Sequence, residues 1–263
     1  MAETTALVRM AKVRTLILRA PGTNCDEETT FAFEQVGAAV DSAHVNELVR
    51  GEKLLSHYQI LVIPGGFTYG DDVSAGKILA NELRLKLGED IQNFIDRGGL
   101  ILGICNGFQV LVRAGILPSA GGNPRLTLAG NDSNRFECRW VYLQVNQKSP
   151  CIFTKGISAI YLPVAHGEGK VVADSKMLDR LNVVVRYADE SGNVKAGYPY
   201  NPNGSMDNIA GICDGSGRIF GLMPHPERFI RWAQHPRWTR EPTREYGDGF
   251  GIFLNAVEWV RRS

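Results

Sequence analysis

The stretch of sequence that decides the fold is Leu100-Ile-Leu-Gly-Ile-Cys-Asn-Gly-Phe-Gln109. Its first five residues form a short apolar run that predicts a buried strand, and helical spacing follows in residues 107–114. Between them, Gly103-Ile-Cys-Asn-Gly107 matches the G-x-nucleophile-x-G pattern, with cysteine as the nucleophile. Such a turn would present Cys105 at the carboxyl end of a strand, where a helix N-terminus stabilises a thiolate. The same residues also fit an unreactive buried cysteine, which is common in protein cores.

The first two-thirds of the chain alternates short apolar runs with longer amphipathic ones. Residues 15–18 and 60–63 predict further buried strands, and helical spacing follows in residues 24–37, 76–87 and 89–97. Strands that alternate with helices indicate an α/β fold with a mainly parallel central sheet and helices on both faces.

Beyond residue 120 the pattern changes to short strand-like runs separated by Gly, Pro, Asn and Asp. We expect these runs to be antiparallel strands added to the parallel core, followed by a helix at residues 250–260. The runs are 135–145, 159–165, 170–173, 183–187, 209–213 and 219–223. Residues 233–248 predict a loop, and no stretch has the composition of a linker between domains.

A cysteine nucleophile needs a base, and usually a group that orients the base. His225 stands in Met223-Pro-His-Pro-Glu227, directly after an apolar run. The prolines favour extended backbone around His225, and in an extended segment residues two apart face the same side. Glu227 could therefore hold the imidazole of His225 in one tautomer. The alternative is a surface turn with an incidental His–Glu pair.

His166 is the rival base, because Ala165-His-Gly-Glu-Gly169 also places a carboxylate, Glu168, two residues after a histidine. Its flanking glycines favour a turn beside a ligand, so we interpret His166 as a substrate-side or structural residue. The remaining histidines, at positions 44, 57 and 235, are typical of the surface. The cysteines at positions 25, 138, 151 and 213 are expected to be inert.

Pro64-Gly-Gly-Phe67 follows a strand, and paired glycines let backbone N–H groups approach a ligand. Gly66 or Phe67 could supply one donor to an oxyanion and Asn106 the other, although a plain turn fits equally well. The later stretch from Gly70 to Lys77 resembles a phosphate-binding loop. Its spacing is one residue too long and it carries two aspartates, so we exclude nucleotide binding there.

Composition excludes several other classes. The 263 residues carry 29 Lys+Arg and 28 Asp+Glu, a formal net charge of +1, which argues against general nucleic-acid binding. No apolar stretch is long enough to span a membrane, and no secretion signal is recognisable. Five cysteines without a CxxC pair fit reduced thiols in a cytoplasmic protein, and we expect no metal site.

Together the cysteine elbow, the earlier Gly-Gly loop and the late His-Pro-Glu resemble the class I, triad-type glutamine amidotransferases. Four further stretches are similar to the glutaminase subunits of phosphoribosylformylglycinamidine synthases: 20–26, 64–71, 134–141 and 165–169. The resemblance implies a flavodoxin-like three-layer fold forming a single domain over residues 1–263. Residues 234–247 would be a loop insertion outside the family pattern.

The resemblance also implies the chemistry. Cys105 would attack the side-chain amide of L-glutamine, with His225 as base and Glu227 orienting it, and the oxyanion would lie between the N–H groups of Gly66 and Asn106. Weaker candidates for holding the substrate are Gln109, Arg135, Phe136, His166 and Glu168.

In this family the ammonia passes to a large synthetase subunit, and in many organisms a small third subunit joins the complex. No cofactor is expected in this chain, since ATP and Mg would belong to the synthetase partner. Two alternatives remain open: a glutaminase serving another synthetase, and a cysteine-dependent hydrolase on a related fold. A non-catalytic regulatory module would have lost the cysteine or the histidine, and both are present.

Overall fold

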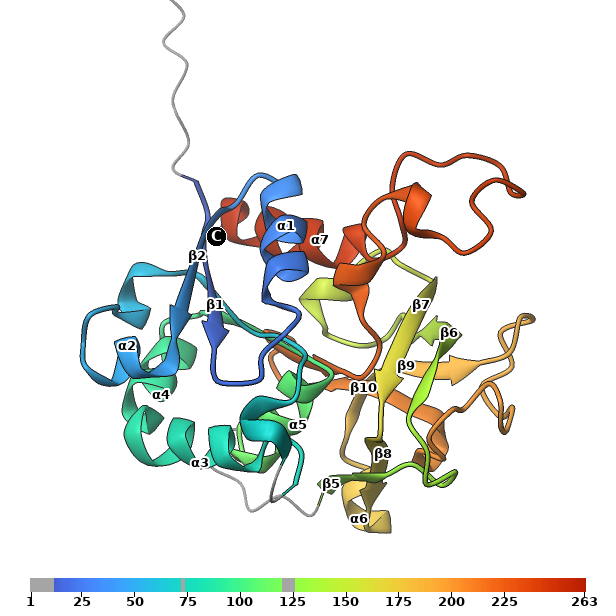
Figure 1. Cartoon of the computed structure of the whole chain (residues 1–263), viewed down its shortest axis with the longest axis horizontal. Helices are drawn as coiled ribbons and strands as arrows, with labels where there is room; N and C mark the ends of the chain where they lie inside the picture. Colours follow the sequence, from blue (N-terminus) through green and yellow to red (C-terminus); the bar gives the residue numbers. More distant parts are fainter. Residues whose placement is uncertain (1–11, 72–73, 120–125) are drawn as a thin grey trace, which may run out of the picture.

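The computed structural model describes residues 12–71, 74–119 and 126–263, so part of the stretch that resembles a phosphate loop lies outside them. Its main element is a nine-stranded sheet in the order β2-β1-β3-β4-β11-β10-β9-β6-β7. A two-stranded sheet of β5 and β8 lies beside it (Figure 1). The strands are β1 (Arg14–Arg19), β2 (Ala39–His44), β3 (Ile60–Ile63), β4 (Leu100–Ile104), β5 (Leu126–Gly130), β6 (Glu137–Val145), β7 (Ala159–His166), β8 (Glu168–Ala173), β9 (Asn182–Ala188), β10 (Ile209–Cys213) and β11 (Ile219–Leu222).

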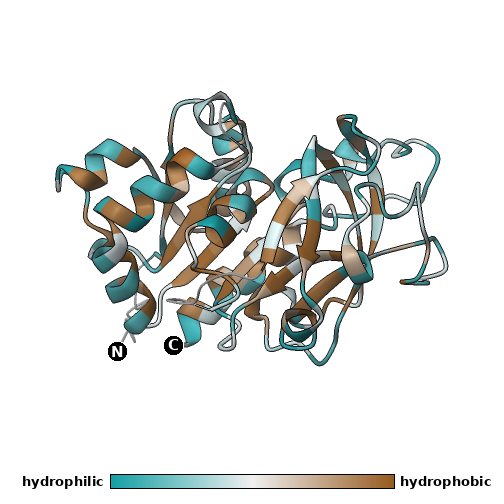
Figure 2. Ribbon diagram, turned by 90° about the horizontal axis from the view of Figure 1, so that it is seen from below, coloured by the Kyte–Doolittle hydropathy of each residue, from teal (hydrophilic) through white to brown (hydrophobic). Residues whose placement is uncertain are grey.

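Helices cover the parallel part of the sheet, and Figure 2 shows the hydrophobic strands with helices on either side. The α-helices are α1 (Asp26–Gln35), α2 (Val45–Val49), α3 (Lys77–Lys86), α4 (Gly88–Asp96), α5 (Asn106–Arg113), α6 (Ser175–Leu178) and α7 (Phe250–Arg262). The α/β class with a mainly parallel sheet and added antiparallel strands is therefore confirmed. None of the described helices is long and apolar enough to cross a membrane.

The parallel half of the sheet consists of β2, β1, β3, β4 and β11. β3 and β4 are buried along their whole length, as their continuous apolar runs predict. The expectation that residues 219–223 add an antiparallel strand is wrong, because β11 pairs in parallel with β4. β11 is antiparallel only to β10, so it closes the parallel half and joins it to the antiparallel half.

The antiparallel half consists of β10, β9, β6 and β7, and β7 is the edge strand. β6 pairs with β9 only through Tyr142–Val145, whereas it pairs with β7 along nearly its whole length. The sheet curls so far that its edge strand β7 reaches the chain that follows β11. The backbone N–H of His225, three residues past the end of β11, donates to the carbonyl of Pro163 in β7 at 2.8 Å. The edge of the antiparallel half thus reaches the carboxyl ends of the parallel strands.

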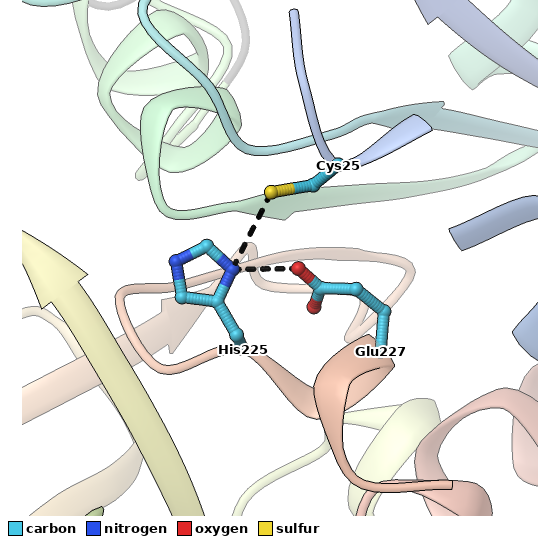
Figure 3. Close-up of side chains that lie close together, drawn as sticks. All are labelled: Cys25, His225 and Glu227. Carbon is cyan, nitrogen blue, oxygen red and sulfur yellow. Dashed lines mark hydrogen bonds and ion pairs between the residues drawn. The ribbon is translucent and has the colours of Figure 1, made fainter. Parts of the chain in front are cut away.

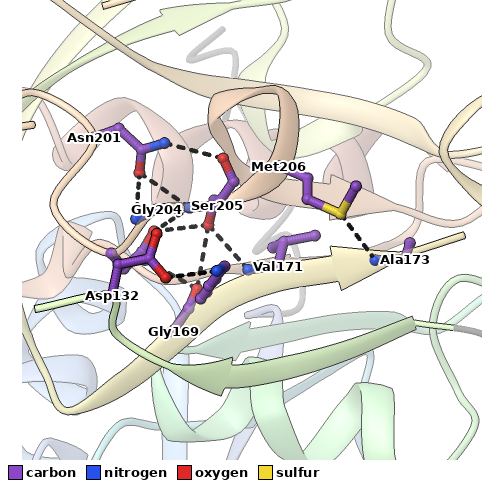
Figure 4. Close-up of polar contacts among 10 residues, drawn as sticks. Asp132, Gly169, Val171, Ala173, Asn201, Gly204, Ser205 and Met206 are labelled. Atoms are coloured by element: carbon purple, nitrogen blue, oxygen red, sulfur yellow. Dashed lines mark hydrogen bonds and ion pairs between the residues drawn. The ribbon is translucent and has the colours of Figure 1, made fainter. Parts of the chain in front are cut away.

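The outer edge of β8 is satisfied by a loop instead of a strand (Figure 4). Val171 N–H donates to Ser205 Oγ at 3.0 Å, and Ala173 N–H donates to Met206 Sδ at 3.4 Å. The carbonyl of Gly169 accepts from the Asn203 amide at 2.9 Å. Every second residue of β8 therefore finds a partner in residues 203–206, a pattern that periodicity in the sequence does not reveal.

Candidate active site

The nucleophile candidate lies in a strained turn between β4 and α5. Cys105 has φ 51° and ψ −106°, a backbone conformation that residues other than glycine rarely adopt. Such strained residues cluster at functional sites. A Cβ at Gly107 would lie 1.8 Å from the carbonyl oxygen of Ile63, so the helix can approach β3 only because residue 107 is glycine. The predicted elbow is therefore the observed local structure, and Cys105 precedes the first turn of α5.

The base candidate follows β11, and Figure 3 shows its imidazole facing a carboxylate. His225 Nδ1 lies 2.6 Å from Glu227 Oε1, and both side chains are buried. Because an ionised carboxylate only accepts hydrogen bonds, Nδ1 carries the proton and Nε2 holds the lone pair. Within the described residues His225 Nε2 has no hydrogen-bond partner. This is the arrangement of a base held in one tautomer.

The backbone conformation that brings Glu227 to His225 differs from the one that the sequence predicts. We expected an extended segment with both residues on one side. His225 is extended (φ −103°, ψ 90°), but Pro226–Arg228 forms a 3-10 turn that brings the Glu227 carboxylate back to the imidazole. Proline at the first position of this turn suits its fixed φ.

Electrostatics couple the two candidate groups. Burial by itself would lower the pKa of His225, but the charges of Glu227 and Cys105 raise that pKa well above its usual value. Cys105 is 5 % exposed, and its Sγ lies 3.7 Å from the Ala165 carbonyl oxygen in β7. The structure therefore brings the sequence-predicted Cys105, His225 and Glu227 into one buried cluster.

The predicted oxyanion donors lie at the ends of neighbouring strands. Gly66 follows β3, and its bridge to Thr23 uses the hydrogen bonds Phe67 N–H to Gly22 O and Asn24 N–H to Gly65 O. In this antiparallel geometry the N–H of Gly66 itself points away from residues 22–24. Asn106 is the first residue of α5, so its N–H has no acceptor within the helix.

A buried side-chain network joins these two donor positions. Asn106 Oδ1 accepts from the Thr68 hydroxyl at 2.7 Å, and Asn106 Nδ2 donates to Gln109 Oε1 at 3.0 Å. Gln109 in turn donates from Nε2 to the Glu168 carbonyl at 2.8 Å. Gln109 therefore lies beside the elbow as expected, with its amide hydrogen-bonded to protein groups on both ends. Thr68 was not singled out by the sequence, where one threonine in a polar loop carries no signal.

His166 lies where a strand ends and not in a turn, which corrects the sequence-based expectation. It is the last residue of β7 and is 3 % exposed. Asn131 donates from Nδ2 to the carbonyls of Arg135 and His166, both at 2.8 Å, so its Oδ1 faces His166 Nδ1 at 3.1 Å. Nδ1 must then be the donor, and the buried Nε2 is an acceptor without a partner in the described residues.

The surroundings keep His166 neutral. Burial, and the nearby charge of His225, lower the pKa of His166 to about 3. A histidine with so low a pKa binds a proton weakly, so His166 is a poorer candidate for the base of this site than His225, whose pKa is raised. His166 instead offers a fixed acceptor atom next to the cluster.

The other substrate-side candidates lie nearer the protein surface than the buried cluster of Cys105, His225 and Glu227. Phe136 is 53 % exposed, and its ring centroid is 6.2 Å from that of Phe67, the residue after Gly66. The Arg135 side chain is also exposed. Glu168 begins β8, and its carboxylate lies 3.5 Å from the Arg113 guanidinium.

Cys25 is a residue of this cluster that the sequence analysis treated as inert. Its backbone N–H donates to the Gly65 carbonyl, and its Sγ lies 3.9 Å from His225 Nδ1. Cys25 follows β1, and β1 pairs in parallel with β3, which leads to Gly66. This neighbourhood at the carboxyl ends of two strands is the signal that could have placed Cys25 near the site. His235, expected on the surface, is also buried, because it stacks on Trp232 at 4.7 Å.

Cys25, His225 and Glu227 offer three ligand atoms within 4.8 Å of one another, which is close enough for a metal ion. These atoms are already engaged, since Nδ1 pairs with Glu227 and Arg228 donates from Nη2 to Cys25 Sγ at 3.0 Å. An added cation would lie beside a guanidinium, so we interpret the three side chains as part of the candidate catalytic cluster and not as a metal site. That no metal binds stays a prediction.

Comparison with known proteins agrees with this geometry. Residues 12–260 match the model of the CobB/CobQ-like glutamine amidotransferase domain. The phosphoribosylformylglycinamidine synthase subunit PurQ of Dehalococcoides mccartyi is 57% identical, covering 96% of this chain and 100% of that protein. The PurQ of Archaeoglobus fulgidus is 44% identical, covering 95% and 98%.

Solved structures are similar as well. A chain in the structure of PurLQS from Thermotoga maritima superposes with a TM-score of 0.71 at 34% identity, covering 95% of this chain and 100% of that one. A Thermotoga maritima glutamine amidotransferase, with a TM-score of 0.56 at 18% identity and coverage of 96% and 100%, shares the fold. The chain thus belongs to the glutamine amidotransferases and, within them, to the family of phosphoribosylformylglycinamidine synthase PurQ subunits.

Proposed function

We propose that this chain hydrolyses L-glutamine to glutamate and supplies the ammonia to phosphoribosylformylglycinamidine synthesis in purine biosynthesis. The observation that carries the proposal is the buried cluster of a strained Cys105 and an imidazole held by Glu227. Family membership gives the substrate class, and the cluster supplies the groups that amide hydrolysis through a thioester requires.

The reaction can be followed through the residues of this cluster. His225 Nε2 takes the proton of the Cys105 thiol, and Cys105 Sγ attacks the side-chain amide carbon of glutamine. The developing oxyanion accepts from the N–H groups of Gly66 and Asn106. His225 donates the proton from Nε2 to the departing ammonia, which leaves a thioester on Cys105. His225 then takes a proton from water, which attacks the thioester and releases glutamate.

Gln109, Arg135, Phe136, His166 and Glu168 complete the proposal as substrate-side residues. His166 is the most specific of them, because its free Nε2 could accept an N–H of the bound glutamine. Loss of that acceptor would raise KM more than it lowers kcat.

The partner in this proposal is a synthetase complex, as the name PurQ and the PurLQS assembly of the structural relative suggest. We propose a large subunit that binds ATP and Mg, and a small third subunit beside it. We further propose that residues 1–263 form one cytoplasmic amidotransferase domain without a cofactor of its own.

The test is covalent labelling with a diazoketone analogue of glutamine, read by peptide mass spectrometry in the complex with the synthetase subunit. We expect modification of Cys105 that excess glutamine prevents and that Cys105→Ser abolishes. Cys138 is exposed and serves as the internal control for non-specific reaction. Equal labelling of Cys105 and Cys138, or labelling that glutamine does not prevent, would reject a glutamine-specific thiol.

A further inference from the structure

The free edge of β7 contacts three functional segments at a spacing of two residues. Since β7 is the last strand of its sheet, its outward N–H and C=O groups have no partner strand. Asp248 accepts the N–H of Tyr161, the Pro163 carbonyl accepts the N–H of His225, and the Ala165 carbonyl lies 3.7 Å from the Cys105 sulfur. Proline at position 163 fits this edge, because its missing N–H faces away from β6.

Of the three contacts, the one between Asp248 and Tyr161 involves no residue that takes part in the proposed reaction. Its Oδ2 accepts from Tyr161 N–H at 2.8 Å, and its Oδ1 accepts from Arg244 Nη1 at 2.7 Å. The Arg244 guanidinium in turn lies over the Trp232 ring at 4.4 Å. The carboxylate is therefore held from both sides, and it joins β7 to the far end of the loop insertion.

The backbone on either side of Asp248 is bonded to the two residues that directly follow the turn with Glu227. Gly247 N–H donates to the Ile230 carbonyl at 2.8 Å, and Gly249 N–H donates to the Phe229 carbonyl at 2.9 Å. A Cβ at Gly249 would lie 1.9 Å from the Pro226 carbonyl oxygen, so this contact requires glycine. Residues 247–249 thus lie directly behind the turn that begins at Pro226.

We propose that Asp248 is a positioning residue for the glutaminase reaction. By bonding to Tyr161 it holds the turn with Glu227 at a fixed place along β7, and two residues further on the same edge holds the backbone of His225. The inference rests on the proposed function, because it concerns the geometry of the same base. It also assigns a role to the residue that directly follows the loop of residues 234–247.

The expected effect is on the rate and not on substrate binding. Removing the carboxylate takes away one of the two hydrogen bonds that join this region to the β7 edge, and the bond from His225 N–H to the Pro163 carbonyl remains. The nucleophile, the oxyanion donors and His166 stay in place. A displacement of about 1 Å between reacting groups can cost up to about 100-fold in rate. Since the backbone contacts of Gly247 and Gly249 remain, we expect kcat to fall about tenfold and KM to change less than twofold.

The experiment compares Asp248→Ala and Asp248→Asn with the parent chain, each assembled with the synthetase subunit, by steady-state glutamine hydrolysis. Asparagine keeps an oxygen that can accept the Tyr161 N–H, so Asp248→Asn should recover most of the lost kcat. The matched control is Asp41→Ala, which removes an aspartate paired with Arg14 at the opposite edge of the sheet and should leave kcat unchanged.

The inference is overturned if Asp248→Ala keeps the parental kcat while circular dichroism shows it folded at the assay temperature, or if Asp248→Asn fails to recover activity. Should Asp248→Ala not fold, Asp248→Ser replaces it, since the shorter side chain cannot reach Tyr161; full activity of that variant rejects the inference equally. Cys105→Ala is run in parallel. If it still hydrolyses glutamine, the proposed function fails, whereas an inactive Cys105→Ala beside a fully active Asp248→Ala rejects only the role of Asp248.

Discussion

The two edges of the nine-stranded sheet, β2 and β7, meet the same physical problem in different ways. The edge strand β2 lies beside a cluster of polar side chains in which Asp41 pairs with Arg14 at 3.0 Å and accepts from the Tyr58 hydroxyl at 2.8 Å. At β7, outward groups are bonded to His225 and Asp248. Unpaired edge groups are a liability that proteins commonly protect with charged side chains or short edge strands. Here one edge follows that rule, and the other holds the candidate active site together.

The largest effect is expected at the turn bonded to the β7 edge. Glu227→Gln removes the charge that orients the His225 imidazole and stabilises its protonated form. Loss of such a carboxylate from a hydrolytic triad lowers kcat by up to about 10⁴-fold. We expect kcat for glutamine hydrolysis to fall by about 10³-fold or more, with KM changed little. A decrease below tenfold would show that the edge holds His225 without help from Glu227.

A smaller effect concerns stability and pH, at His166 in the last position of β7. Its pKa is about 3 in the folded chain against a usual 6.5, so the unfolded chain binds the proton more tightly. The contribution of His166 to the free energy of unfolding is therefore fully present above pH 6.5 and is lost as the pH falls toward 3. At about 1.4 kcal/mol per pH unit, the free energy of unfolding should drop by roughly 2 kcal/mol between pH 6.5 and 5.

Urea unfolding of the parent chain and of His166→Gln at pH 6.5 and pH 5 measures this contribution. Other titrating groups are shared by the two proteins, so the drop should be about 2 kcal/mol smaller in the variant. His57→Gln, at an exposed histidine, is the control and should keep the parental dependence. Parallel pH dependences in all three proteins would contradict the assignment of His166 as a buried neutral imidazole.

The smallest effect is expected at the β2 edge. A hydrogen bond from Tyr58, with the nearby Arg14 and Lys53, lowers the pKa of Asp41 despite its partial burial. Because the Asp41 side chain is 38% exposed, Asp41→Asn should reduce the free energy of unfolding by less than about 1 kcal/mol at pH 7. This contribution should vanish at low pH, as the carboxylate becomes protonated in both states. Any change in kcat with Asp41→Asn would mean that the two edges are coupled through the sheet.

The parts of the fold that were predicted correctly are those with a local signal. The continuous apolar runs of β3 and β4 and the glycine-flanked Cys105 are visible in a few consecutive residues. β2 was missed, because its Asp and Ser interrupt both the apolar run and the alternation. β11 was placed in the wrong half of the sheet, since a run of four apolar residues does not reveal the direction of its neighbour.

The candidate site divides in the same way. Cys105, His225 and Glu227 could be predicted because each lies in a short motif whose residue types match one chemistry. Cys25 and Asp248 could not, because a cysteine before a helix and an aspartate between glycines are ordinary in isolation. Their roles depend on contacts with residues 200 and 87 positions away, respectively.

The sequence by itself thus determined the α/β class, the elbow at Cys105 and the short motif that holds the candidate base, because strand periodicity and turn chemistry act over a few neighbouring residues. Only the tertiary structure decided which edge of the sheet faces the site and which groups hold the base there. The curl that brings Pro163 to His225 results from strand pairing across the whole antiparallel half. Such pairing depends on side chains far apart in the chain, so no local stretch encodes it.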